Sequence, residues 1–444
     1  MSLFSYYLQQ GIRSLRRTPV LTGLMVLSIA VGIGASMTTL TVMHLLSGDP
    51  LPGRSQHLYY PQVDASPRGE KARKEPLDML DYTSAVDLWR EGPAERKALI
   101  SESPIKLSAP GSAAPASISR LLSTTADFFP MFQVPMAYGT GWSSEDDERR
   151  ARVAVISWDL NQRLFGGKDS VGQMLRIRDS DVRIIGVLKP WRPAPLYYRV
   201  AGGRFAQGDT ADFYGPPQEV MVPFFTGLQI NAGHFQQFTC WGDLPEKPGH
   251  LENTNCVWLQ QWVQLDTPAQ VASYEQFLQS YVQQQNQLGR ISQPELARLR
   301  SLMQWLDFNG VVPRDVRLQA WMALAFLGIC LFNTIGLLLA KFLRRTGEIG
   351  VLRALGATRG MIFKQCLTEA ALIGLAGGLA GLLLTLFGLW SVRQQPLAYA
   401  DMMQLDLRML GFTLLAAITT TLLAGLLPAL RAACIDPALQ IKAL

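Results

Sequence analysis

The segment 165–169 has the residue types of a phosphate-binding loop but not their spacing. It contains two glycines followed by a lysine. A loop that cradles the phosphates of ATP also needs an earlier glycine and a hydroxyl residue directly after the lysine. Gln162 and Asp169 occupy those two positions. The sequence therefore predicts no ATP site in this chain.

Four consecutive acidic residues, Glu145 to Glu148, could act as an acid pair or bind a metal ion. A run of like charges is more typical of a solvated turn, and that is what we expect here. The sequence contains no Gly-x-Ser-x-Gly elbow and no His-Glu-x-x-His helix, and none of its four histidines forms a recognisable pattern with Ser or Cys. An active site assembled from scattered residues remains open, but no local motif indicates one.

Cys240 and Cys256 lie near His234 and His250, which raises the alternatives of a metal site and a disulfide. The irregular spacing of these four residues matches no zinc-ligand pattern. The residues between the two cysteines are rich in proline, glycine and polar types, which is typical of a loop that a disulfide would close. We expect the pair to be oxidised if this part of the chain faces an oxidising compartment.

Long uncharged stretches decide which compartment each of these residues faces. Hydrophobic residues make up 48% of the chain and charged residues only 17%, which is unusual for a soluble globule. Four stretches without acidic or basic residues are long enough to cross a hydrocarbon core of about 30 Å as helices. They lie between Arg17 and Asp49, Arg317 and Lys341, Glu369 and Arg393, and Arg408 and Arg431.

The flanking charges predict the orientation of these spans. Arginines precede the first span, and several lysines and arginines against the single acid Glu348 separate the second from the third. Such flanks remain in the cytoplasm. Acidic residues slightly outnumber basic ones in 47–317, so the net charge of +6 arises from the spans and their flanks. The basic excess is a topology signal and does not indicate nucleic-acid binding.

We therefore expect a polytopic α-helical membrane protein with four transmembrane helices and a large mixed α/β periplasmic domain between helices 1 and 2. The expected segments are a cytoplasmic interfacial helix at 1–19, transmembrane helix 1 at 20–46, the periplasmic core domain at 47–317, transmembrane helix 2 at 318–340, a cytoplasmic coupling segment at 341–366, transmembrane helix 3 at 367–392, a periplasmic loop at 393–408, transmembrane helix 4 at 409–430 and a cytoplasmic tail at 431–444. A frayed N-terminus is the alternative to the interfacial helix.

Apolar and polar periodicity predicts mixed secondary structure in the external domain. Helices are expected at 81–89, 159–164 and 268–285. Strands are expected at 152–156, 174–177, 182–188, 219–223 and 257–265. The glycine- and proline-rich segments 109–117 and 190–217 are expected to be linkers, the second a mobile surface loop.

The segment after the second span combines features of a docking helix. It runs Arg-Arg-Thr-Gly-Glu-Ile-Gly-Val-Leu-Arg-Ala-Leu-Gly-Ala-Thr-Arg over 344–359. We expect a short helix with an apolar side that fits a partner's groove, ended by Gly356. The apolar side is expected to contain Ile349, Leu352 and Leu355, and the charged side Arg345, Glu348 and Arg353. The alternative is a basic interfacial helix that only fixes topology, but it explains neither Glu348 nor the glycines.

This segment resembles the cytoplasmic signature of the MacB/FtsX-like family of ABC transporter permeases, which has a basic pair, Glu-Ile-Gly and Arg-Ala-Leu-Gly-Ala. In the external domain, segments 155–157, 163–167, 170–173 and 185–188 are similar to the periplasmic core domain of the macrolide-exporter branch. The order of the spans fits as well. The chain departs from that exporter in containing no fused nucleotide-binding domain.

The resemblance implies a permease of the bacterial inner membrane that works by mechanotransmission. A separate ABC ATPase dimer would bind ATP and Mg, and this chain would bind no cofactor. A second permease copy or a paralogous permease is the expected membrane partner, and an adaptor with an outer-membrane duct is a further candidate. The coupling residues would be Arg345, Glu348, Ile349, Gly350, Leu352, Arg353, Gly356 and Arg359. A signalling scaffold that regulates a cell-wall hydrolase and a membrane-anchored enzyme are the rival classes.

Small residues recur at three- and four-residue intervals in two spans, a pattern typical of close helix packing. The third span contains Gly374, Gly377, Gly378 and Gly381, and the first contains Gly32. These faces could serve packing within one chain or a permease dimer, and the sequence does not separate the two.

Overall fold

The computed structural model describes residues 3–66, 74–108, 116–206, 211–241, 250–252, 255–312, 314–395, 400–402 and 407–434. The chain forms two compact units. A helical unit contains Met1–Ser47 and Val312–Leu444, and a sheet unit contains Gly48–Val311. The predicted segments 109–115, 403–406 and 435–444 lie outside the described residues.

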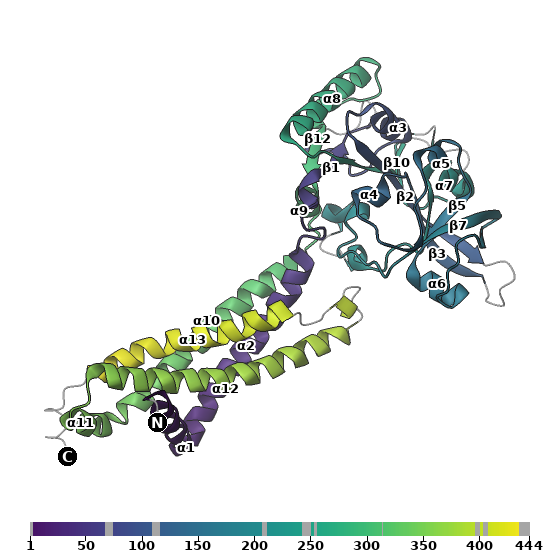
Figure 1. Ribbon diagram of the computed structural model, residues 1–444. Helices are drawn as coiled ribbons and strands as arrows, with labels where there is room; N and C mark the ends of the chain where they lie inside the picture. Colours follow the sequence, from purple (N-terminus) through teal and green to yellow (C-terminus); the bar gives the residue numbers. More distant parts are fainter. Residues whose placement is uncertain are drawn as a thin grey trace. The chain divides into compact units, whose positions relative to one another are not determined.

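In the described residues, the helical unit consists of four long helices and two shorter ones (Figure 1). Its helices are α1 (Leu3–Arg17), α2 (Pro19–Ser47), α10 (Arg314–Leu343), α11 (Thr346–Ala354), α12 (Arg359–Arg393) and α13 (Leu407–Ala433), with a 3-10 turn at Ala400–Met402. In the described residues, α2, α10 and α12 are each long and apolar enough to cross a membrane. Helix α13 is 27 residues long and apolar as well, so the unit provides the four expected transmembrane helices.

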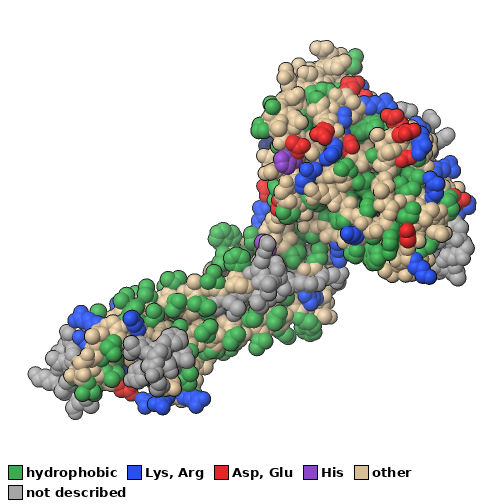
Figure 2. Space-filling model, viewed as in Figure 1, with side chains coloured by type: hydrophobic (Ala, Val, Ile, Leu, Met, Phe, Trp, Pro, Cys, Tyr) green, Lys and Arg blue, Asp and Glu red, His purple; other side chains and the backbone are tan. Residues whose placement is uncertain are grey.

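The helices of this unit are apolar both inside and outside. Ile29, Ile33 and Ile373 are buried in one core cluster, whereas Trp321, Phe332 and other large apolar side chains are exposed. Hydrophobic side chains accordingly cover much of the visible surface of these helices (Figure 2). A helix that is hydrophobic all round is expected in lipid, where the outer face needs no polar cover.

The sheet unit is built on one mixed sheet of ten strands, ordered β12-β1-β11-β2-β3-β8-β5-β7-β4, with β6 paired to β2 and β7. The strands are β1 (Leu58–Gln62), β2 (Arg96–Ser108), β3 (Ser117–Thr124), β4 (Met136–Gly139), β5 (Val153–Ile156), β6 (Met174–Ile177), β7 (Ser180–Leu188), β8 (Val220–Pro223), β11 (Gln260–Gln264) and β12 (Arg298–Ser301). Strands β3 and β8 are parallel, as are β5 and β7, and the other neighbours are antiparallel. A mixed α/β domain is therefore confirmed.

Short helices surround this sheet (Figure 1). They are α3 (Tyr82–Glu91), α4 (Phe128–Met131), α5 (Ser144–Glu148), α6 (Trp158–Phe165), α7 (Phe224–Asn231), α8 (Pro268–Gln287) and α9 (Leu302–Phe308), with 3-10 turns at Ser55–His57, Tyr197–Arg199, Gly203–Phe205, Ala211–Tyr214 and Pro294–Leu296. The predicted helices at 81–89, 159–164 and 268–285 correspond to α3, α6 and α8. Helix α8 begins at a capping box in which the Thr267 side chain accepts from the backbone of Gln270.

The segment 190–217 is not the surface loop that its glycine and proline content predicts. Tyr197, Tyr198 and Tyr214 are completely buried. The Tyr198 hydroxyl donates to Gln218 Oε1 at 2.6 Å, and the Trp262 ring N–H donates to the Tyr198 carbonyl at 3.1 Å. The tyrosines that suggested a mobile surface are instead core residues, because burial of a large ring stabilises the fold. The Tyr198 hydroxyl keeps a hydrogen-bond partner, whereas the Tyr197 hydroxyl has none among the described residues.

The acidic cluster is only partly the solvated turn that its charges predict. Helix α5 begins at Ser143, whose side chain forms a capping box with Asp146. Asp147, however, is buried, and its carboxylate accepts from the Ala126 backbone N–H at 2.6 Å and from Trp142 Nε1 at 3.0 Å. Burial raises the pKa of Asp147 to about 7. The residue joins the start of α4 to α5, which a run of like charges does not reveal.

Cys240 and Cys256 are joined by a disulfide. They lie opposite each other in a two-stranded sheet formed by β9 (Thr239–Cys240) and β10 (Cys256–Val257). This is the pairing that the sequence predicts. The bond closes the segment between the two strands, where the chain has few apolar side chains to hold it.

Candidate functional site

Helix α11 has the predicted position between the second and third spans. Its chain turns after Ala354, and Gly356 adopts a left-handed conformation with φ of +99°, which favours glycine. Thr358 then caps α12 by accepting from the Met361 backbone N–H at 3.3 Å. The motif therefore encodes a short helix, a turn at a glycine and the N-terminus of the next helix.

The apolar face predicted for this helix is wrong in part. Ile349 is buried in the core of the helical unit, with Leu352 packed against the same cluster, and Gly350 is buried as well. The side chains that point outward are Val351, 48% exposed, and Leu355, 81% exposed. Successive helical residues turn by about 100°, so Ile349 shares a face with Arg345, four residues earlier, rather than with Leu355.

Gly347 completes this outward face. A methyl group at its Cα would meet nothing within 4 Å, so the helix surface is open there. Gly347, Val351 and Leu355 follow one another at four-residue spacing, and we call them the outer face of α11. A contiguous apolar surface beyond the membrane-spanning helices is suited to a protein partner.

A buried group of charged side chains lies on the side of the segment opposite to this outer face. The Lys341 ammonium at the end of α10 forms an ion pair with Glu369 of α12, and these side chains are 1% and 2% exposed. Arg345 Nη1 lies 3.2 Å from the second oxygen of Glu369. Ser14 of α1 donates to Glu369 and accepts from Arg345 Nη1 at 2.8 Å. We call Ser14, Lys341, Arg345 and Glu369 the buried charge cluster.

An exposed pair extends this cluster onto α11 itself. Arg345 Nε donates to Glu348 Oε2 at 3.0 Å, and Arg17 Nη1 lies 3.5 Å from the other oxygen of Glu348. Glu348 is 52% exposed, so each of these contacts is worth only about 0 to 1 kcal/mol. The buried contacts matter more, since removing one partner of a buried pair leaves an uncompensated charge and costs about 3 to 5 kcal/mol.

Together these contacts connect four helices at one end of the helical unit. Glu369 in α12 contacts α1 through Ser14, α10 through Lys341, and the residue preceding α11 through Arg345. A displacement of α11 is therefore resisted by charge pairs to its neighbours rather than by apolar contact alone. The segment therefore has an exposed outer face, and its inner side is connected to the neighbouring helices by ion pairs.

The sequence predicted Arg345 and Glu348 in this site but missed Ser14, Lys341 and Glu369. Glu369 could have been found, because it is an acidic residue inside the third predicted span, and charged groups within a span face polar partners. Arg359 is exposed at the start of α12, and Arg353 is half-buried in the last turn of α11.

The predicted packing glycines face helices of the same chain. A Cβ at Gly377 would lie 2.7 Å from Ile29, one at Gly381 3.2 Å from Ile33, one at Gly374 2.0 Å from Thr421, and one at Gly32 2.9 Å from Cys330. Gly378 is buried in α12. These contacts join α12 to α2 and α13, and α2 to α10, so the small residues allow close approach within the chain.

A mixed-sheet unit between the first two of four long apolar helices, followed after the second by the short helix α11, is the order of elements in this chain. Residues 22–281 match the model of the MacB-like periplasmic core domain, and residues 320–437 match the model of the FtsX-like permease C-terminal domain. The chain therefore belongs to the MacB/FtsX-like family of ABC transporter permeases.

Curated relatives are similar over most of this chain. A pyoverdine export ATP-binding/permease protein, PvdT of Pseudomonas syringae pv. syringae (strain B728a), is 25% identical over 313 residues, which cover 70% of this chain and 40% of the relative. The macrolide export ATP-binding/permease protein MacB of Wolinella succinogenes is 25% identical over 328 residues, with coverage of 72% and 43%. The chain thus spans about two fifths of these relatives.

Among solved structures, the periplasmic region of MacB from Actinobacillus actinomycetemcomitans aligns with 58% of this chain and 94% of its own. The sequence identity is 11% and the TM-score is 0.35.

Proposed function

We propose that this chain is the permease subunit of an ABC transporter and couples ATP hydrolysis by a partner ATPase to conformational change of its external domain. The observation that carries the proposal is the two-sided construction of α11. Its outer face exposes Val351 and Leu355, while the residues around it are fixed to α1, α10 and α12 by the buried charge cluster. Mechanotransmission needs both properties, because a docking surface without a rigid connection transmits no force.

The proposed path runs from the ATPase to the sheet unit through continuous helices. Closure of the ATPase dimer displaces α11, and the charge cluster passes that displacement to α10 and α12. The chain leaves the helical unit at Ser47, the last residue of α2, and re-enters it at Val312, shortly before α10 begins at Arg314. Movement of these two helices relative to each other therefore changes the strain on the sheet unit at its ends.

The location and partners follow from the same proposal. The basic flanks place α11 in the cytoplasm of a bacterium and the sheet unit in the periplasm, with the chain in the inner membrane. ATP and Mg bind to a nucleotide-binding domain outside these 444 residues. A second permease copy or a paralogous permease completes the transporter. The work is export or extraction of a substrate, in line with the export functions named for PvdT and MacB.

Purification of the full chain from native membranes tests this proposal. We expect an ABC ATPase to co-purify, and Leu355→Asp to reduce its recovery about tenfold or more, because the substitution buries an unpaired charge in the interface. Leu288→Asp is the matched control, since Leu288 is also a largely exposed leucine, 67% exposed, and lies in the sheet unit. Recovery of a cell-wall hydrolase without transport activity would favour the scaffold instead. Unchanged ATPase recovery with Leu355→Asp would exclude α11 as the docking element.

A further inference from the structure

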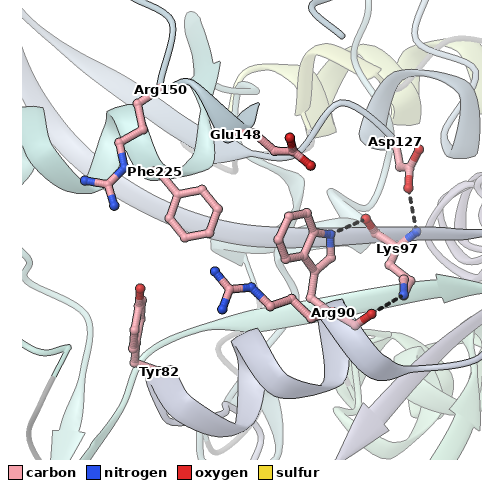
Figure 3. Close-up of a pocket in the computed structure, with 8 residues that line it drawn as sticks. Tyr82, Arg90, Lys97, Asp127, Glu148, Arg150 and Phe225 are labelled. Carbon is pink, nitrogen blue, oxygen red and sulfur yellow. Dashed lines mark hydrogen bonds between the residues drawn. The ribbon is translucent and has the colours of Figure 1, made fainter. Parts of the chain in front are cut away.

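The sheet unit contains a cavity of about 570 Å³ that none of the preceding functions uses. Its walls come from α3, from the start of β2, from the turn before α4, from the end of α5 and from α7. Figure 3 shows eight of the side chains that line it. A volume of this size holds a small organic molecule or the last residues of a peptide.

One wall of the cavity is aromatic and held in place. The rings of Trp89 and Phe225 meet edge to face with centroids 5.8 Å apart. Trp89 Nε1 donates to the Lys97 carbonyl at 3.2 Å, and Phe225 is buried in the core of the unit. These two rings, inclined at 63° to each other, therefore provide a fixed apolar surface for a bound apolar group.

Two arginines add positive charge beside this wall. The Arg150 guanidinium carbon lies 5.9 Å from the centroid of the Phe225 ring, and Arg90 lies in the last turn of α3. In Figure 3 both guanidinium groups and the Tyr82 hydroxyl lie on the side of the cavity occupied by Phe225. Within the described part of the sheet unit, neither guanidinium is paired with a carboxylate.

The other charged groups of the cavity have structural partners or stand in solvent. Asp127 accepts from the Lys97 backbone N–H at 2.9 Å. The Lys97 ammonium donates to the Gly92 carbonyl at 2.8 Å and to the Arg90 carbonyl at 3.4 Å, and burial lowers its pKa. Glu148 is exposed at the edge. The two arginines are thus the charged donors left for a bound molecule.

Hydrogen bonds in the turn that ends α5 fix the backbone conformation of Arg150. Its φ is +54°, a left-handed conformation that is costly for residues with a side chain. Hydrogen bonds on both sides impose it, because the Arg150 N–H donates to the Asp147 carbonyl at 3.2 Å and the Ala151 N–H to the Asp146 carbonyl at 2.9 Å. The turn that ends α5 therefore presents this guanidinium to the cavity.

We propose that this cavity binds a carboxylate that carries an aromatic group, with the carboxylate between Arg90 and Arg150 and the aromatic group against Trp89 and Phe225. A guanidinium forms two parallel hydrogen bonds with a carboxylate, which makes this pairing stronger than one with a neutral acceptor. The Tyr82 hydroxyl supplies a further donor. The inference is independent of ATP coupling, because binding to the cavity requires no partner.

Titration of the full chain in nanodiscs tests the site with three probes. They are N-acetylphenylalanine, its amide, and an acetylated tripeptide that ends in phenylalanine with a free carboxylate. We expect saturable binding of the two acids and at least about tenfold weaker binding of the amide. Equal affinity for the acids assigns the site to small carboxylates, and tighter binding of the tripeptide assigns it to a peptide terminus.

Substitution of the two arginines locates the binding. Arg90→Gln and Arg150→Gln should each weaken binding of the acids about tenfold and leave the weak binding of the amide unchanged. Arg149→Gln is the matched control, because Arg149 is exposed next to Arg150 but pairs with Asp146 and does not line the cavity. Both arginines are exposed, so the variants retain the fold. No binding of either acid, equal binding of the amide, or acid binding unchanged in both variants would overturn the proposal.

Discussion

Replacement of Glu369 by Gln should weaken the helical unit far more than an exposed substitution does. The change preserves the shape of the side chain but leaves Lys341, which is 1% exposed, without a carboxylate. It also removes the charge that Arg345 Nη1 approaches at 3.2 Å. Loss of one partner of a buried pair costs about 3 to 5 kcal/mol. At roughly 2 to 4 °C per kcal/mol, the midpoint of thermal unfolding should fall on the order of 10 °C.

The buried thiol of Cys366 provides the assay. It lies in the core of the helical unit, three residues before Glu369, whereas Cys434 is exposed. Cys330 is a second buried free thiol of the helical unit. In a background with Cys330→Ala and Cys434→Ser, a maleimide dye that fluoresces on reaction therefore reports the temperature at which the core around Cys366 opens. The full chain is measured in detergent, with and without the Glu369→Gln change.

Two further variants make the result interpretable. Lys341→Met combined with Glu369→Gln should recover most of the lost stability, because the uncompensated charge is gone. Glu348→Gln should change the free energy of unfolding by less than about 1 kcal/mol, since Glu348 is half exposed. An unchanged midpoint for Glu369→Gln, or a double variant as unstable as the two single changes added together, would refute the ion pair as the connection between α10 and α12.

Three other expectations concern packing, redox state and pH. Gly377→Ala should lower the unfolding midpoint of the helical unit, because its Cβ would lie 2.7 Å from a side chain of α2, whereas Gly336→Ala, with open space around it, should not. Mass spectrometry of unreduced peptides should recover Cys240 linked to Cys256, and free thiols at both positions would count against an oxidising compartment. Because burial raises the pKa of Asp147 from its ordinary value of 3.8 to about 7, its contribution to stability is complete below pH 3.8 and is lost as the pH rises towards and through 7. The full chain should therefore melt lower at pH 8 than at pH 5, and Asp147→Asn should flatten that difference.

Element types were predictable wherever periodicity was strong. The uncharged stretches predicted the spans, and 174–177 was predicted as the strand that the structure has at Met174–Ile177. The 13-residue strand β2 was not predicted, because its polar and apolar residues form no clear run near Pro104. The buried tyrosines of 190–217 were misjudged for a related reason. Glycine and proline content describes the backbone and does not reveal which rings a neighbouring sheet will cover.

In the site as well, features with a local cause were predictable, and contacts between residues far apart in the sequence were not. The turn at Gly356 was predictable because its cause is local. The pairing of Lys341 with Glu369 joins residues 28 positions apart and depends on how two helices cross, which no local pattern encodes. The orientation of α11 was misjudged because Ile349 and Leu355 are not on one face at 100° per residue. The packing against α10 and α12 decided which face was left exposed.

Hydrogen exchange of the reconstituted complex is the most direct measurement of coupling. The full chain and its ATPase are placed in nanodiscs and compared with and without ATP and Mg. Exchange of backbone amides in the sheet unit, Gly48–Val311, should change when ATP is added, although the proposed topology puts the ATP site on the other side of the membrane. Leu355→Asp should abolish that change. Identical exchange throughout the sheet unit while the ATPase is active would contradict coupling.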